Sequence, residues 1–249
     1  MAEQVCERGR MKPADNFWNI LSGIDGGRIL DVACGRGQFV RILVDNLGAF
    51  SHITGLDVDR EALEQASDEF QAGNIIFLYG TSRQIGFPDA VFDTVSMSKG
   101  LHHLEDPGLG LREMKRVVKE GGLLIINEMY SDDLSLSQMS HMNHHHLRAE
   151  IDRLLGISHN YTFTRDRILE MVDELGLHDA TVYDYTEDTG PADSPELIGE
   201  YLAKMDTWTQ QVKGMQEEEQ LLAAMEELKE QFYEHGISRP PQVVILGNK

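Results

Sequence analysis

The chain has 249 residues, a length that can bury one full hydrophobic core but is short for two large domains. Its 42 Asp and Glu residues outnumber its 22 Lys and Arg residues, and the net charge of −20 argues against polyanionic partners such as nucleic acids and acidic membrane surfaces. A small or cationic acceptor, or a protein, fits this charge better.

The cysteine content and the hydropathy of the chain predict its compartment. Cys6 and Cys34 are the two cysteines, and Cys34 lies inside a glycine turn where no disulfide partner is expected. We therefore expect a reducing, cytoplasmic setting. The first residues contain no apolar stretch of the signal-peptide kind, and no run approaches the ~20 apolar residues of a membrane span, so we expect a soluble protein.

Apolar runs with strand character alternate with helical patterns along the chain. The first five runs cover residues 28–33, 51–57, 74–79, 91–97 and 122–128. Strands that alternate with helices predict a doubly wound α/β fold, a parallel sheet with helices on both faces. After the fifth run, the pattern predicts a His-rich helix over 134–156, a helix over 164–175, a strand over 181–186, two acidic helical stretches within 194–235 and a last strand over 241–247.

Two motifs near the start of the chain carry most of the functional information. The run ILDVACGRGQF, residues 29–39, predicts a strand, a glycine turn and the start of a helix, and GLDVD, residues 55–59, predicts a second strand that ends in an acid. Gly35 and Gly37 allow a sharp turn and a close approach of the backbone to a ligand, although glycine pairs also mark ordinary turns. Asp57 lies where doubly wound sheets bind nucleotides and where an acid accepts hydrogen bonds from ribose hydroxyls.

The spacing DxACGxG resembles the first motif of class I S-adenosylmethionine (SAM)-dependent methyltransferases, and GLDVD resembles their second. FPDAVFDTVSMSKGLHHLEDP at 87–107 is similar to their fourth-strand region, and EMKRVVKEGGLLIINE at 113–128 is similar to the helix, Gly-Gly turn and fifth strand that follow. The resemblance implies a seven-strand sheet in which the last strand is antiparallel and lies between the fifth and sixth. It also implies a single domain with helical insertions at about 134–160 and 190–236 that cover the acceptor site.

The resemblance implies a SAM site and its residues. Asp31, Gly35 and Gly37 would line the methionine end of SAM, Asp57 would bind the ribose, and Ser98 would lie beside the methionine portion. Thr81 stands where many relatives have an acid that meets the adenine amino group, which leaves the affinity for SAM in question. The full set of expected cofactor-binding residues is Asp31, Ala33, Gly35, Gly37, Asp57, Val58, Thr81, Ser82, Ser98 and Lys99.

Catalytic residues are harder to assign, because methyl transfer from a sulfonium is an in-line displacement that needs mainly correct positioning and exclusion of water. His102 and His103 face the cleft mouth in similar enzymes, where an imidazole could take a proton from the acceptor. A packing role for both histidines is the alternative. Glu128 and Tyr130, just after the fifth strand, are further candidates for the acceptor pocket.

The segment HMNHHHLRAEIDRLLGISH is rich in histidine. At 100° per residue, His141, His145 and Asp152 fall on one side of the predicted helix, where they could hold a divalent metal, while His144 joins the apolar face and is expected to be buried. His146 points the other way, towards solvent. The alternatives are histidines clustered by chance, or an acceptor pocket in which His145 and its neighbours recognise an anionic or hydrogen-bonding group.

The sequence therefore predicts a cytoplasmic SAM-dependent methyltransferase that acts on a small molecule, releases S-adenosylhomocysteine and binds neither nucleic acid nor membrane. The acidic, His-rich insertions favour a cationic or metal-chelating acceptor, with His145 as a further catalytic candidate. The acidic helices could instead form a homodimer. Two other functions stay open: a SAM-binding regulatory or scaffold protein without transferase activity, and a nicotinamide-dependent oxidoreductase, which the absence of GxGxxG disfavours. Residues 11–18 could fold over the cofactor or cover the first strand.

Overall fold

The computed structural model describes residues 20–249, so Cys6 and residues 11–18 lie outside the described residues. The described chain forms two compact units. Unit 1 contains the described part of Met1–Glu128 together with Asp166–Tyr185 and Gln242–Lys249, and unit 2 contains Met129–Arg165 and Thr186–Pro241. Unit 2 thus collects the two segments that the sequence predicts as helical insertions, and their role as a cover over the acceptor stays a prediction.

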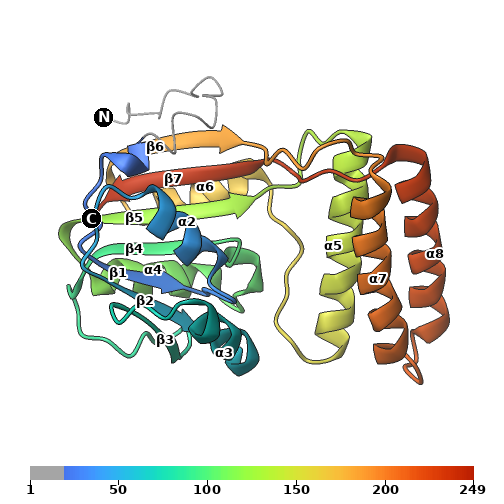
Figure 1. Ribbon diagram of the computed structural model, residues 1–249, viewed down its shortest axis with the longest axis horizontal. Coiled ribbons are helices and arrows are strands. Elements are labelled where there is room, and N and C mark those ends of the chain that lie inside the picture. Colours follow the sequence, from blue (N-terminus) through green and yellow to red (C-terminus); the bar gives the residue numbers. More distant parts are fainter. Residues whose placement is uncertain (1–19) are drawn as a thin grey trace. The chain divides into compact units, whose positions relative to one another are not determined.

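Unit 1 is built on a seven-stranded sheet with the order β3-β2-β1-β4-β5-β7-β6 (Figure 1). The strands are β1 (Arg28–Val32), β2 (His52–Asp57), β3 (Ile75–Tyr79), β4 (Phe92–Ser98), β5 (Val118–Met129), β6 (His178–Tyr185) and β7 (Gln242–Asn248). The pairs of β1 with β2 and β4, β2 with β3, and β4 with β5 are parallel, while β6 and β7 are antiparallel. The predicted position of the last strand, between the fifth and the sixth, is confirmed.

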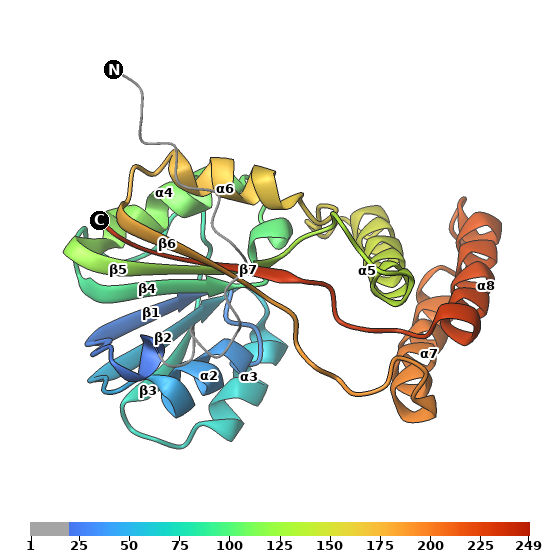
Figure 2. The same cartoon turned by 90° about the horizontal axis from the view of Figure 1, so that it is seen from above.

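Helices cover both faces of this sheet, as the alternating pattern predicts. The helices α2 (Gln38–Asn46) and α3 (Arg60–Glu69) lie on one face, and α4 (Pro107–Val117) and α6 (Arg165–Asp173) lie on the other (Figure 2). A short 3₁₀ helix, η1 (Leu101–His103), follows β4. The helix α3 begins cleanly because the Asp59 side chain accepts hydrogen bonds from the amides of Glu61 and Ala62, which have no partner within the helix.

Two strands begin earlier than predicted: β5, and β6, which begins at the exposed His178 and not at residue 181. The strand β5 begins at Val118, immediately after α4, whereas the apolar pattern predicts a start at 122. Phe92 pairs with Val118 and Thr94 pairs with Leu123, so β5 carries extra residues in a bulge at this point. Gly121, with φ of 72°, supplies the left-handed backbone there. The polar residues of this bulge hide the beginning of the strand from a hydropathy pattern.

Unit 2 contains three helices, α5 (Leu136–Leu154), α7 (Pro195–Gln211) and α8 (Glu218–His235), which run side by side in Figure 1. A capping box starts α5: the Ser135 side chain accepts from the Gln138 amide, and the Gln138 side chain accepts from the Ser135 amide. All three helices contribute to a shared core that includes Ile151, Trp208 and Phe232. Unit 2 therefore has its own hydrophobic core.

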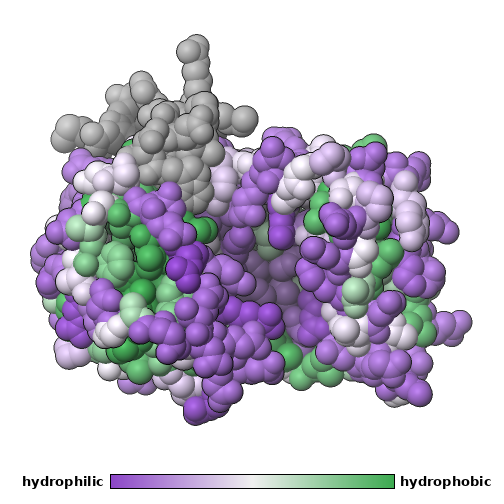
Figure 3. All heavy atoms as spheres, viewed as in Figure 1, coloured by the Kyte–Doolittle hydropathy of each residue, from purple (hydrophilic) through white to green (hydrophobic). Residues whose placement is uncertain are grey.

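Among residues 20–249, no helix is both long and apolar enough to cross a membrane. The face of the molecule in Figure 3 is covered mainly by hydrophilic residues, with apolar residues in scattered groups. That surface agrees with the large excess of acidic residues in the chain.

Candidate functional site

The turn between β1 and α2 has the backbone that the glycine motif predicts. Ala33, Gly35 and Gly37 all have positive φ, of 55°, 51° and 82°. Gly37 is the residue that caps α2, and a Cβ added there would lie 2.9 Å from Cε2 of Phe70, so glycine is needed for both conformation and space. The amide of Gly37 donates to the carbonyl of Cys34. The turn is thus held close to the carboxyl ends of β1 and β2.

Asp57, at the end of β2, ties this turn to its own strand. Its Oδ2 accepts a hydrogen bond of 2.7 Å from the Gly35 amide, and its Oδ1 accepts one of 2.9 Å from the Asp59 amide. Each carboxylate oxygen has a second lone pair, so Asp57 can still accept hydrogen bonds from a ligand. The side chain is half-buried, which leaves it within reach of such a ligand.

Asp31, in β1, is a buried carboxyl with an incomplete set of partners. Its Oδ1 accepts a hydrogen bond of 2.6 Å from the Ser96 hydroxyl of β4, but no described group donates to its buried Oδ2. Burial raises the pKa of Asp31 to about 7; the Ser96 hydrogen bond opposes this rise and the nearby charge of Asp57 adds to it. A cationic or hydrogen-bonding group from a ligand would satisfy the remaining oxygen.

Thr81 and Ser82, the residues expected around the adenine, follow β3, and Val58, another expected cofactor residue, follows β2. Val58, directly after β2, is 60% exposed, which is unusual for an apolar residue at the end of a buried strand. The Thr81 hydroxyl accepts a hydrogen bond from the Arg83 amide, so that side chain already has a local role in the turn. The Ser82 side chain lies against Gly110 of α4. An exposed Val58 offers an apolar surface to a flat ring.

At the end of β4, Ser98 belongs to a polar network that the sequence pattern does not reveal. The Asn127 side-chain amide lies 2.9 Å from the Ser98 hydroxyl and 3.2 Å from the side-chain oxygens of both Tyr185 and Gln242. The backbone carbonyl of Asn127 also accepts a hydrogen bond from the backbone amide of Lys99, a residue with φ of 50°. Asn127 of β5 thus holds both Ser98 and Lys99, while Tyr185 and Gln242 hold the Asn127 side chain. The Lys99 side chain is exposed.

His102 and Glu128 form a buried pair in unit 1. His102 Nδ1 lies 2.9 Å from Glu128 Oε1, and Glu128 Oε2 accepts a hydrogen bond of 2.8 Å from the Leu101 amide. Their side chains are 1% and 0% exposed. The pair fastens η1 to the end of β5, which is a positioning role. His103, the next residue, is exposed, and its ring centroid lies 4.2 Å from that of His102.

In unit 2, the residues considered for a metal are engaged with other groups. His141 Nε2 lies 3.4 Å from an Arg239 nitrogen, whereas Asp152 pairs with Arg148 and accepts from His159 at 2.7 Å. His145 Nε2 meets His159 Nε2 at 3.1 Å. Among the described residues, His141, His145 and Asp152 do not form a group whose ligand atoms all lie within 4.8 Å of one another.

Two further expectations for the His-rich helix can be compared with the structure. His144 is buried, as expected, and its ring lies among those of Tyr201, Trp208 and Phe232. The prediction that His146 points to open solvent is wrong, because its Nε2 lies 3.2 Å from the Thr162 amide and its ring contacts Tyr161. The loop after α5 returns over this side of the helix, and helical periodicity cannot foresee a returning loop.

Sequence reasoning missed several residues that the structure brings into these sites. Ser96 pairs in register with Asp31 across β1 and β4, and its one signal is a hydroxyl within an otherwise apolar strand. Asn127, Tyr185 and Gln242 come from separate strands, and nothing in their local sequence joins them. The sequence pattern includes His159 in the histidine-rich segment, but it does not predict that His159 links His145 to Asp152.

Comparison with known proteins gives a consistent result. Residues 30–126 match a family model described as a methyltransferase domain. A demethylmenaquinone methyltransferase of Geobacillus kaustophilus is 30% identical over 200 residues, which cover 75% of this chain and 86% of that protein. A demethylmenaquinone methyltransferase of Bacillus licheniformis is 33% identical over 129 residues, or 51% of this chain and 56% of the relative.

Solved structures share the fold. A crystal structure described as a putative methyltransferase from Bacillus halodurans aligns with a TM-score of 0.61 at 17% identity, covering 94% of this chain and 97% of that one. A phosphoethanolamine N-methyltransferase 2 of Haemonchus contortus, in complex with phosphomonomethylethanolamine and S-adenosylhomocysteine, aligns with a TM-score of 0.56 at 17% identity, covering 94% of this chain and 52% of that one.

Proposed function

Because the chain belongs to the class I SAM-dependent methyltransferases and transfers methyl groups to small molecules, we propose that it binds SAM along the carboxyl ends of β1, β2 and β4 in unit 1. The observation that carries this proposal is that two carboxylates, those of Asp31 and Asp57, flank a left-handed turn. Asp57 holds the Gly35 amide with one oxygen and keeps lone pairs for a ribose, while buried Asp31 has an oxygen that no described group satisfies.

These residues fit the chemistry of the proposed ligand. The ammonium of the methionine portion is a cation that suits Asp31 Oδ2, and ribose hydroxyls are donors that suit Asp57. The left-handed turn at Ala33, Gly35 and Gly37 lets the backbone approach the ligand. Further contacts are proposed from the other residues at this edge: Val58, Thr81, Ser82, Ser98 and Lys99.

The protein has two tasks in this reaction: it must position the acceptor for methyl transfer, and for some acceptors it must accept a proton. SAM supplies an electrophilic methyl group on a sulfonium, and the protein has to hold the acceptor in line with it and exclude water. We give His102 and Glu128 the role of positioning η1, because both side chains are buried and bonded to each other. The His103 side chain is exposed, unlike those of His102 and Glu128, and we propose it as the proton acceptor for substrates that must lose one. His145 is a second candidate.

The remaining parts of the proposal concern the surroundings. We propose a cytoplasmic enzyme with no nucleic-acid or membrane partner, since its charge is strongly negative. A homodimer through the acidic helices is compatible with this proposal. Hydrogen-bond contacts to other protein groups engage His141, His145 and Asp152, so we do not assign a metal to them. The name of the Geobacillus relative makes a demethylmenaquinone-type ring a reasonable first acceptor to assay.

Calorimetric titration with SAM and with S-adenosylhomocysteine tests the cofactor site. We expect micromolar binding of both ligands to the full chain. Asp57→Asn should weaken both by about 10- to 100-fold, because a hydrogen bond to a charged group is worth about 1.5–3 kcal/mol. Asp59→Asn is the matched control, since Asn also caps helices well and this residue is not assigned to SAM. Equal effects of the two substitutions, or no binding to the unmodified chain, would contradict the proposed site.

A further inference from the structure

Unit 2 carries a pocket of its own, with a volume of about 500 Å³. The helix α5 lines it with His144, His145 and Arg148, and α7 lines it with Lys204, Thr207 and Trp208. Sites for small organic ligands span roughly 300–1,000 Å³, so this pocket has a suitable size. None of the residues assigned to SAM contributes to its lining.

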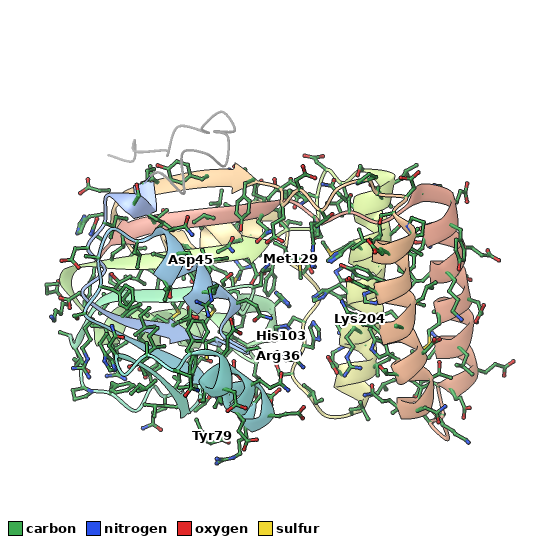
Figure 4. All side chains as sticks on the ribbon, in the orientation of Figure 1. Arg36, Asp45, Tyr79, His103, Met129 and Lys204 are labelled. Carbon is green, nitrogen blue, oxygen red and sulfur yellow. The ribbon has the colours of Figure 1, made fainter. Side chains whose placement is uncertain are left out.

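The pocket is electropositive, in contrast to the net charge of −20 of the chain. Arg148 pairs with Asp152 and donates to Gln211, so its charge is locally balanced. For Lys204, whose side chain comes from α7 (Figure 4), no described carboxylate lies within ion-pair distance, and its Nζ lies 4.5 Å from the Tyr201 ring centroid. The lining therefore has a surplus of about one positive charge.

The pKa shifts of the lining reflect burial first and neighbouring charges second. Desolvation lowers the pKa of Lys204, the nearby charge of Arg239 lowers it further, and the charge of Glu200 opposes both effects. Desolvation also lowers the pKa of His144 to about 3, with smaller contributions from Lys204 and Arg148, so this imidazole is neutral at physiological pH. An anion beside Lys204 would offset both the repulsion between cations and the loss of hydration.

The uncharged part of the lining is flat and aromatic. The rings of His144 and Trp208 have centroids 4.5 Å apart, with an angle of 37° between their planes. His144 Nε2 is buried and has no hydrogen-bond partner in the described chain. His144 and Trp208 are 7% and 5% exposed and pack on each other, so they give the pocket a small apolar wall and no open ring face.

A chain of hydrogen bonds fixes the remaining wall. Asp152 accepts from His159 Nδ1, so in a neutral His159 the Nε2 atom is an acceptor and His145 Nε2 must be the donor to it. Desolvation opposes ionisation of Asp152, but its bonds to His159 and Arg148 outweigh this effect and lower its pKa. The ionised carboxylate thereby sets the tautomer and ring orientation of His145.

We propose that this pocket binds small organic carboxylates, with the carboxylate beside Lys204 and Arg148. A single surplus charge matches a monoanion better than a phosphate, which carries close to two charges at neutral pH. The inference goes beyond the proposed function, since it assigns unit 2 a ligand site of its own. The charge of the lining, and not the net charge of the chain, meets a ligand in this pocket.

Ligand-observed NMR titration of the full chain tests the proposal, with 4-hydroxybenzoate and the neutral 4-hydroxybenzamide as probes. We expect the carboxylate to bind at least about tenfold more tightly than the amide. Lys204→Gln should reduce carboxylate affinity by about tenfold and leave amide affinity unchanged. The matched control is Lys213→Gln, an exposed residue just after α7 with the same loss of charge, and it should change carboxylate affinity by less than about twofold.

Titration of the same samples with S-adenosylhomocysteine separates this inference from the proposed function. Retained S-adenosylhomocysteine binding without carboxylate binding would overturn the carboxylate pocket and leave the cofactor site intact. Carboxylate binding that responds to Lys204→Gln, without S-adenosylhomocysteine binding, would support the pocket and contradict the cofactor site. Equal affinity for acid and amide, or equal effects of the two lysine variants, would also overturn the inference.

Discussion

Replacement of Asp31 by Asn should stabilise the ligand-free protein at alkaline pH. Burial raises the pKa of this carboxyl from 3.8 to about 7, against the Ser96 hydrogen bond and with help from Asp57. The folded state then binds more protons than the unfolded state between these two values, so its stability falls as pH rises from about 4 to 7. A pKa difference of this size corresponds to about 4 kcal/mol lost above pH 7.

Urea unfolding at pH 5 and at pH 8 measures this effect. Asn is isosteric and keeps an oxygen for the Ser96 hydroxyl, so the stability of the Asp31→Asn variant relative to the unmodified chain should rise by about 2–3 kcal/mol between pH 5 and pH 8. Asp45→Asn, on the exposed side of α2, makes the same chemical change without burial and should not show this rise (Figure 4). Identical pH dependence of the Asp31→Asn variant and the unmodified chain would refute the reasoning.

The same carboxyl should couple SAM binding to proton release. An ammonium group favours the ionised form, so at pH 6, where a carboxyl of pKa about 7 is mainly protonated, SAM binding should release close to one proton. Calorimetry in two buffers with different protonation enthalpies measures the number released. The Asp31→Asn variant should bind SAM more weakly and release none. Proton release that survives this substitution would assign the titration to another group.

Three further outcomes follow from the geometry of unit 1. Glu128→Gln should cost about 1–3 kcal/mol of unfolding free energy, measured in urea, because it weakens the buried bond to His102; a loss of methyl transfer without a loss of stability would instead make Glu128 catalytic. Gly37→Ala should cost about 1–3 kcal/mol and weaken S-adenosylhomocysteine binding, since φ is 82° and the new Cβ would press on Phe70; an unchanged melting temperature would contradict this. Replacing His103 by Gln should lower the rate at acceptors that lose a proton and leave S-adenosylhomocysteine affinity unchanged, which a rate assay and calorimetry check together.

Local patterns were sufficient to predict the sheet. Apart from the polar beginnings of β5 and β6, each strand of unit 1 is a short apolar run, and the segment 134–156 has the spacing of the helix observed as α5. The position of the last strand required the family resemblance, because hydropathy does not order strands. The start of β5 required the three-dimensional structure, since Lys119 and Glu120 in its bulge look like loop residues.

The site was predictable where its partners belong to neighbouring motifs, and it was not predictable where the partners are distant in the chain. The contact of Asp57 with the Gly35 amide joins two motifs that the sequence already associates. Ser96 lies 65 residues from Asp31, and its hydroxyl becomes meaningful only after β1 and β4 pair. The charge of the pocket in unit 2 was hidden for the same reason, since Arg148 and Lys204 belong to different helices within a strongly acidic chain.

The register of β6 and β7 has an evolutionary consequence. Tyr185 and Gln242 pair directly as antiparallel neighbours, yet 57 residues separate them, and α7 and α8 lie wholly within that span. The segment that contains both helices is therefore the connection between two antiparallel strands, as the loop is in a β-hairpin. Doubling the length of such a loop costs only about 0.6 kcal/mol of closure free energy. Substitutions, insertions or an exchanged helical hairpin between Tyr185 and Gln242 can therefore diversify unit 2, while the strands of unit 1 keep their register.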